Sequence, residues 1–396
     1  MKNFCYIFTA ILLLGFLSLS ANALPRFTLM SGQPCMACHV NPTGGAMRNS
    51  YGTQMVSMGD LPMWRSDSFE VSTRLTPNIS FGADTRAQML SANSLYNFSA
   101  TPPGPGAGGT AFQPMQASIY LNVDLTENIS VYIKNDFITS GGFEFWGIAR
   151  ILPNDGYIKV GAFQPAIGLR VDDHTSFTRD GDYTQDGKYW GFGIYPNSKD
   201  VGLEVGEYFD NFFVCASVTN GEFPLGNVGA ATAAPNFTPN KAFTGRLEYT
   251  NLITDDIGIM LGASGFVNDS LNIYGGFGGI RVGVATITAD YEMGKNLTSG
   301  GMTDTTNANA LMMELSVKII QGLYGTLKYD SFTPDQANTS ANNVARWTIG
   351  AEWYPVNFVE IIPQFRMLKE NSTAVGATAS TANTLNEFLL QLHLWI

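Results

Sequence analysis

The clearest chemical signature in this sequence is the pentapeptide Cys35-Met36-Ala37-Cys38-His39. In a Cys-x-x-Cys-His segment the two thiols form thioether bonds to a haem, and the histidine that follows them coordinates the iron. The spacing therefore predicts one covalently bound haem c, with Cys35 and Cys38 as its attachment points and His39 as an axial ligand. A haem held in this way transfers electrons, so we expect a redox role for the chain.

The second axial ligand of the iron has several candidates. Met55 and Met58 lie in the same short segment as His39, and a ligand from nearby closes a smaller loop at a lower entropic cost. We therefore favour Met55 or Met58. His174 is the alternative, because it begins a long connection that could fold back toward the haem, whereas His393 is assigned a structural role. A methionine ligand raises the reduction potential and a second histidine lowers it.

Other charged residues have smaller predicted roles. Arg26 and Arg48 flank the pentapeptide and are candidate partners for the haem propionates, since a guanidinium group holds a carboxylate through two hydrogen bonds. The competing interpretation is that both arginines pair with carboxylates of the protein itself. Five acidic residues gather around His174, and we expect them to be solvated in an external loop. They are Asp172, Asp173, Asp180, Asp182 and Asp186.

The first 23 residues have the features of a secretory signal peptide. Lys2 provides a basic start, residues 7–19 are apolar, and Ala21-Asn22-Ala23 forms a small-residue cleavage site. We expect cleavage to leave Leu24 as the mature N-terminus, so that the haem segment matures outside the cytoplasm.

Composition restricts the class of protein further. The chain has 22 Lys and Arg against 33 Asp and Glu and no basic cluster, which argues against a nucleic-acid partner. Cys5 belongs to the signal segment and only Cys215 remains outside the haem motif, so no disulfide framework is expected. Past residue 23 no apolar run is long enough for a membrane-spanning helix, so a membrane-embedded form must be a closed β-barrel.

A hydrophobic period of two indicates that barrel. Within residues 284–293 apolar side chains occupy every second position, and the same alternation recurs in 243–249 and 323–332. Such strands present one face to lipid and the other to water. We place sixteen strands, at residues 68–81, 115–125, 129–138, 142–152, 156–164, 200–208, 211–219, 241–249, 257–266, 271–281, 284–293, 311–320, 323–332, 344–354, 358–368 and 386–396.

The connections between these strands fall into two classes. Tight turns are predicted at 155–156, 209–211, 321–322 and 355–357, and long polar connections at 82–114, 165–199, 220–240, 294–310, 333–343 and 369–385. Outer-membrane barrels have short periplasmic turns and long external loops. The sequence therefore predicts an all-β, antiparallel transmembrane barrel of about 16 strands over residues 67–396, embedded in the outer-membrane lipid of a diderm bacterium.

The segment between the signal peptide and the barrel, residues 24–66, is predicted to carry the haem. So short a segment cannot supply the apolar surface that a haem needs. We therefore expect the haem to pack on the periplasmic side of the barrel or in its lumen, since a barrel of sixteen strands is wide enough to accept a plug.

In its layout the chain resembles the outer-membrane fused monohaem cytochrome–porins of iron-oxidising bacteria. The resemblance includes Pro25 and Phe27 before the haem motif and Tyr51-Gly52 after it, whereas residues 41–45, Asn-Pro-Thr-Gly-Gly, differ from the apolar Phe-Pro stretch of that family. Residues 161–168, Gly-Ala-Phe-Gln-Pro-Ala-Ile-Gly, are similar to the G-x-F-x-P-x-x-G pattern of phosphate-selective porins.

The family resemblance implies that electrons pass between an extracellular partner and a periplasmic cytochrome or other electron carrier, in either direction. With ferrous iron as the donor, the chain would act as an extracellular iron oxidase. The alternative is a general or anion-selective diffusion porin in which the haem segment is a plug or redox gate. A haem-bearing sensor or adhesion barrel is a third possibility.

Overall fold

The computed structural model describes residues 25–45, 47–65, 71–93, 96–97, 104–105, 108–138, 142–171, 173–183, 189–194, 198–221, 241–269, 271–297, 306–334, 343–372 and 381–396. The predicted signal segment, Asp172 and Asp186 lie outside these residues. Within them, sixteen long strands form one sheet: β2 (Ile79–Ala92), β5 (Gly109–Asp124), β6 (Ile129–Asp136), β7 (Glu144–Ala149), β8 (Tyr157–Phe163), β11 (Asp200–Phe209), β12 (Phe212–Thr219), β13 (Ala242–Thr254), β14 (Ile257–Val267), β15 (Asn272–Val282), β16 (Ala285–Leu297), β17 (Thr306–Ile320), β18 (Leu323–Thr333), β19 (Asn343–Trp353), β20 (Val359–Ser372) and β21 (Thr381–Trp395).

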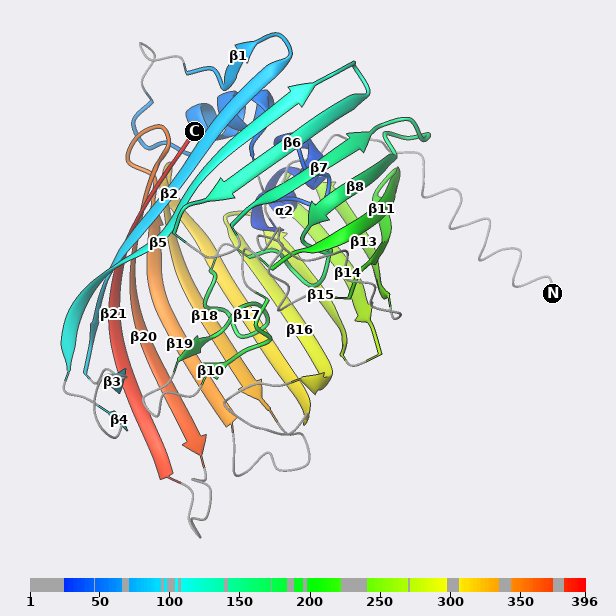
Figure 1. The fold of residues 1–396 in the computed structure, drawn as a ribbon. Coiled ribbons are helices and arrows are strands. Elements are labelled where there is room, and N and C mark those ends of the chain that lie inside the picture. Colours follow the sequence, from blue (N-terminus) through cyan, green and yellow to red (C-terminus); the bar gives the residue numbers. More distant parts are fainter. Residues whose placement is uncertain are drawn as a thin grey trace, which may run out of the picture.

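The sheet closes on itself as an antiparallel barrel (Figure 1). Each long strand pairs with its neighbours along the chain, and β21 returns to pair with β2 from Asp84↔Trp395 to Ala92↔Glu387. A short strand, β1 (Arg74–Thr76), lies against the start of β2. Closure leaves no unpaired edge, which a sheet in lipid requires. The predicted fold class is confirmed.

The two faces of the strands differ as a membrane barrel requires. Along β21 the side chains of Phe388, Leu390, Leu392 and Leu394 are exposed on the outside, whereas His393 is buried. The same alternation sends apolar residues outward along the other strands and buries charged ones inside, so the outer face suits lipid. Among the described residues, no helix combines the length and hydropathy needed to cross a bilayer.

The position predicted for the first strand was wrong. We expected a strand at 68–81 and a long connection at 82–114, but β2 occupies Ile79–Ala92 and β5 begins at Gly109. In β2 the inward positions include Asp84 and Arg86, and the outward positions include Thr85 and Ala87. Phe81 and Met89 also lie on the outward face, but the small residues between them leave only a weak apolar alternation in β2.

Several other connections are also shorter than predicted. β17 begins at Thr306 within the expected connection 294–310, and β20 and β21 extend to Ser372 and from Thr381 into the expected connection 369–385. Barrel strands continue beyond the lipid into polar surroundings, so the apolar alternation ends before the ladder does.

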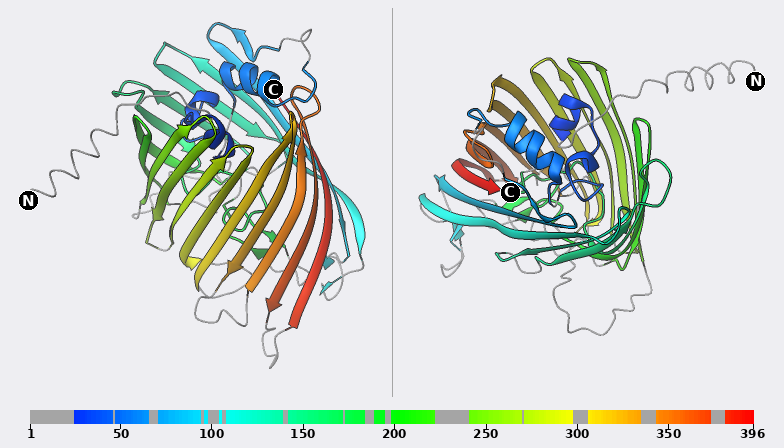
Figure 2. Two further views of the ribbon diagram at one scale, coloured as in Figure 1. Left: turned by 180° about the vertical axis from the view of Figure 1, so that it is seen from behind. Right: turned by 90° about the horizontal axis from the view of Figure 1, so that it is seen from above.

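A small N-terminal domain covers one mouth of the barrel, and we call residues 25–65 the plug. It contains α2 (Pro25–Ser31), α3 (Cys35–Cys38) and η1 (Gly52–Asp60). Figure 2 shows these helices across the mouth from which the C-terminus also emerges. The tight turns lie at this mouth, since Met63 N–H of the plug donates to Tyr354 O at 2.8 Å and Tyr354 N–H donates to Gly322 O at 2.7 Å. By the short-turn rule this is the periplasmic end.

The connection between β8 and β11 folds inside the barrel, and we call residues 164–199 the lumenal loop. It carries the short strands β9 (Asp182–Tyr183) and β10 (Tyr189–Trp190), which pair with each other. Phe177, Trp190 and Phe192 of the loop are buried in one apolar cluster with inward residues of the wall, such as Phe266 and Phe332. The loop therefore fills part of the lumen.

Candidate functional site

The haem motif lies on a short helix that the rest of the plug fixes in place. α3 begins after Pro34 and ends at His39, whose N–H donates to Cys35 O at 3.0 Å. The Asn49 amide donates to Met36 O and Ala37 O at 3.1 and 2.9 Å, which satisfies two carbonyl groups at the end of the helix. Val40 N–H donates to Met47 O at 3.1 Å and Asn49 N–H donates to Cys38 O at 2.8 Å, which brings the two sides of a hairpin together beside the motif.

Gly52 permits close packing of η1 on α3. A Cβ at this position would collide with the backbone oxygen of Cys38, so only glycine allows the approach. Gly52, which with Tyr51 forms the aromatic-Gly pair that resembles the cytochrome–porins, thus has a packing role.

The three residues of the motif are placed differently. Cys35 is half-buried and lines a small cavity together with His39. Cys38 is buried beneath η1. Burial raises the pKa of the Cys35 thiol to about 12, so the thiol is protonated at neutral pH. Both cysteines are free of disulfide bonds.

The plug is attached to the barrel by hydrogen bonds from the wall. Arg281 donates to Met30 O at 2.6 Å, Tyr208 OH donates to Pro42 O at 3.0 Å, and Arg150 donates to Val40 O at 3.1 Å. These contacts come from well-separated strands, so they hold the haem motif at a defined position in the mouth.

The lumenal loop contacts the plug from the opposite side. Arg170 of the loop donates to Gly44 O of the plug at 2.7 Å and to Gln164 O at 3.1 Å. Arg179 donates to Ile167 O at 2.9 Å, which closes the loop on itself. Burial lowers the pKa of both arginines, that of Arg179 to about 10.

A large cavity next to the motif lies between the plug and the lumenal loop. His39 and Arg48 of the plug line it, together with Arg170, His174 and Arg179 of the loop. It also includes charged side chains of the wall, among them Asp84, Arg86, Lys134 and Glu144. Basic groups outnumber acidic ones around this space, so it is suited to an anionic group.

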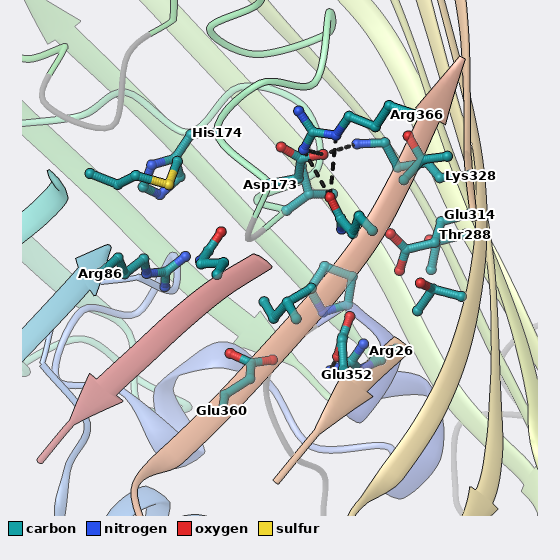
Figure 3. A pocket seen from close by; sticks show the side chains of 18 residues that line it. Arg26, Arg86, Asp173, His174, Thr288, Glu314, Lys328, Glu352, Glu360 and Arg366 are labelled. Carbon is teal, nitrogen blue, oxygen red and sulfur yellow. Dashed lines mark hydrogen bonds and ion pairs between the residues drawn. The ribbon is translucent and has the colours of Figure 1, made fainter. Parts of the chain in front are cut away.

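A second cavity lies beside the first and shares His174 and Asp173 with it. Figure 3 shows Asp173 against Arg366 and Lys328, with His174 directed away from these ion pairs. Burial alone would raise the pKa of Asp173, but Lys328 and Arg366 hold it well below its usual range.

The structure separates the two arginines predicted to flank the haem. Arg48 lines the large cavity with His39, and its guanidinium lies 5.0 Å from the ring centre of Trp395. Arg26 does not line that cavity; it pairs with Glu352 and donates to Tyr354 OH at 2.8 Å. Sequence reasoning missed Arg170 and Arg179, because no local pattern marks an arginine that reaches the site from a distant loop.

The candidate axial ligands are also separated. Met55 is 55% exposed, and neither Met55 nor Met58 lines the large cavity between the plug and the lumenal loop. His174 does line the large cavity with His39. His393 is buried in the wall between Glu360 and Asp84, which agrees with a structural role.

We expected the acidic residues of this loop to be solvated. For Asp173, Asp180 and Asp182, the three that the structure describes, this prediction was wrong. Asp173 is ion-paired with Lys328 and Arg366, and Asp182 accepts from Arg346 at 3.1 Å. Burial and the neighbouring Asp182 raise the pKa of Asp180 to about 8. Among the described residues, no group of three or more His, Cys, Asp or Glu side chains forms a metal site.

Comparison with solved structures identifies the fold. The barrel matches Pseudomonas putida OprB with a TM-score of 0.55 at 10% identity, over 81% of this chain and 94% of that one. It matches an anion-selective porin from Comamonas acidovorans with a TM-score of 0.53 at 11% identity, over 80% and 99%. It also matches Salmonella typhi OmpF with a TM-score of 0.52 at 12% identity, over 81% and 98%. The chain has a porin fold.

No protein-family model matches the chain, and no curated protein does. The porin likeness therefore concerns the architecture of the barrel.

Proposed function

We propose that this chain is an outer-membrane cytochrome–porin that carries electrons between an extracellular partner and a periplasmic electron carrier through one covalently bound haem c. The observation that carries the proposal is the position of the Cys35-x-x-Cys38-His39 motif. It lies on a plug at the periplasmic mouth of a closed barrel, beside a cavity that His39, Arg48 and Arg170 line.

Part of the lining of this cavity would serve a bound haem. His39 lines both this cavity and a smaller one that Cys35 lines, while Cys38 would have to turn out from beneath η1 to form the second thioether bond. Arg48 and Arg170 supply cations for the propionates, and apolar surface comes from Tyr120, Val171 and Ile194. When bound, the haem supplies one-electron chemistry.

The packing of the lumen favours electron transfer over diffusion. The plug covers the periplasmic mouth, and the lumenal loop places Phe177, Trp190 and Phe192 in an apolar cluster inside the barrel. Such a cluster hinders the passage of hydrated solutes, whereas electrons cross packed protein without a water-filled path.

The second candidate is a general or anion-selective diffusion porin with the haem segment as a plug or redox gate. It is supported by the likeness of the barrel to porins and by the charged lining of both cavities. In this case the plug or the loop has to move aside to open a path.

Proteoliposomes separate the two candidates. Oxidised soluble cytochrome c is trapped inside, ferrous iron is added outside, and the wild type is compared with a Cys35→Ala, Cys38→Ala variant that lacks the attachment sites. We expect reduction of the trapped cytochrome by the wild type and only background reduction by the variant, with slow swelling in neutral sugars for both. Equal reduction by both proteins with rapid swelling would support the diffusion porin instead.

A further inference from the structure

We propose that the cavity between the plug and the lumenal loop binds a small multivalent anion carrying phosphate or carboxylate groups, with Lys134 of the barrel wall as a principal binding residue. This site goes beyond the proposed function, because the bound anion is neither the haem nor a solute that diffuses through an open pore.

Lys134 is the side chain that points to a ligand. It lies on the inward face of β6, lines this cavity and is only 7% exposed. Its ammonium group lies 5.9 Å from the ring centre of Tyr120. Within the part of the chain that the structure describes, Lys134 has no hydrogen bond to an acceptor and no ion pair. Burying a charge without a partner is costly, so a lysine at this position indicates a counter-charge supplied by a ligand.

A second buried lysine adds positive charge near Lys134. Lys199 of the lumenal loop donates to Phe143 O at 2.9 Å. Burial lowers the pKa of Lys199 to about 8, and Lys134 lowers it as well, while Glu144 acts in the opposite direction. The two ammonium groups therefore repel each other, and an anion beside Lys134 would relieve this repulsion.

The carboxylates of the cavity do not balance its cations. Five arginine or lysine side chains line it, against three carboxylates. Asp173 is paired with Lys328 and Arg366, as Figure 3 shows, and Asp84 lies 3.6 Å from Arg86. Once these two carboxylates and Arg86 are set aside, four cationic side chains face one carboxylate. An enclosed space with such an excess of positive charge concentrates anions.

The four cations come from three parts of the molecule. Arg48 belongs to the plug, Arg170 and Arg179 to the lumenal loop, and Lys134 to the wall. Among the described residues, none of the three arginines is ion-paired with a carboxylate. A guanidinium group binds phosphate or carboxylate oxygens through two hydrogen bonds, which favours a multivalent anion over chloride. A bound anion would therefore join plug, loop and wall and stabilise the closed arrangement.

Thermal unfolding of the full-length protein in detergent tests the site. Phosphate and citrate are each compared with chloride at equal ionic strength. We expect a higher unfolding midpoint in phosphate, in citrate or in both, because a ligand that binds only the folded state stabilises it. Lys134→Met should lose most of this increase, whereas Lys241→Gln, which removes a charge at an exposed position, should keep it. No increase in the wild type, or an equal increase in Lys134→Met, would overturn the site.

Two further measurements exclude misfolding as the explanation. In chloride alone, Lys134→Met should be at least as stable as the wild type, because it removes a buried charge that has no partner. Lys134→Arg keeps the charge and should keep the increase in phosphate or citrate. A Lys134→Arg protein that folds but does not respond to either anion would count against the site. Lys134→Gln replaces Lys134→Met if the methionine variant does not fold.

The same measurement separates this site from the haem. We expect the Cys35→Ala, Cys38→Ala variant and the haem-loaded wild type to show the same increase. An increase confined to the variant would mean that the haem propionates fill the site, and it would overturn the proposal of a separate anion. A wild type that carries no haem but still responds to phosphate or citrate would overturn the proposed function alone.

Discussion

Asp180 is a carboxyl group that the fold keeps neutral over much of the physiological range. Burial and the nearby Asp182 raise its pKa to about 8, against about 3.8 in an unfolded chain. Between these values the folded state binds a proton that the unfolded state has released. The contribution of Asp180 to stability is therefore present at low pH and is lost as the pH rises from about 4 to about 8.

The substitution Asp180→Asn should remove this dependence. We expect the variant to gain stability relative to the wild type as the pH is raised from 5 to 8, measured as the difference between their thermal unfolding midpoints in detergent. Asp155→Asn is the matched control, because Asp155 is exposed in a periplasmic turn. A difference between wild type and Asp180→Asn that does not change with pH would contradict the argument.

Gly52 is the residue on which the packing of the plug depends. In Gly52→Ala the new methyl group meets the backbone of Cys38, and relief of such overpacking typically costs about 1–3 kcal/mol. We expect less covalent haem per folded barrel, measured by in-gel haem staining against barrel protein. Gly59→Ala in the same helix is the control, since its Cβ would lie 3.6 Å from the nearest atom, Gln54 O, an ordinary contact. Equal loss of haem in both variants would refute a specific role for Gly52.

At the scale of elements, the sequence predicted most strands because lipid imposes an apolar residue at every second position. The exception is β2, where Ala83, Thr85 and Ala87 separate the outward residues Phe81 and Met89 and weaken the apolar stripe. The path of the lumenal loop could not be predicted. Its position depends on Lys328, Arg346 and Arg366, which belong to strands far along the chain. No sequence pattern near Asp173 indicates these partners.

The same limit applies to the candidate site. The Cys-x-x-Cys-His motif is local, so its five residues are visible in the sequence. Arg170 and His174 line the cavity only because the loop folds inward, where Lys328 and Arg366 pair with Asp173.

Arg346 should be the residue whose loss releases the lumenal loop. It is fully buried between Asp330 and Asp182, and removing one partner of a buried ion pair costs about 3–5 kcal/mol. We expect Arg346→Met to raise single-channel conductance in planar bilayers several-fold and to make the loop sensitive to added protease. Lys241→Met, at an exposed position, should leave both properties unchanged. Wild-type conductance in Arg346→Met would mean that the loop is held by its apolar cluster alone.

At the scale of the whole molecule, the barrel depends on the seam where its first and last strands meet. His393 of β21 contacts Glu360 Oε2 of β20 at 2.8 Å through Nδ1 and Asp84 Oδ1 of β2 at 3.0 Å through Nε2. Tyr354 OH donates to the other oxygen of Glu360 at 2.6 Å. One imidazole thus joins three consecutive strands across the closure, and two buried carboxylates share it.

Replacing His393 by leucine should therefore weaken the whole barrel. Asp84 and Glu360 would remain buried without their shared partner, at a cost of about 3–5 kcal/mol. We expect a lower urea midpoint for the loss of the compact, heat-modifiable band on gels. Gln391→Leu is the matched control, because it places the same side chain two positions earlier on the same face of β21, where no carboxylate pair depends on the residue replaced. If the two variants unfold at the same urea concentration, the seam is stabilised by its backbone ladder, and the charged triad contributes nothing to closure.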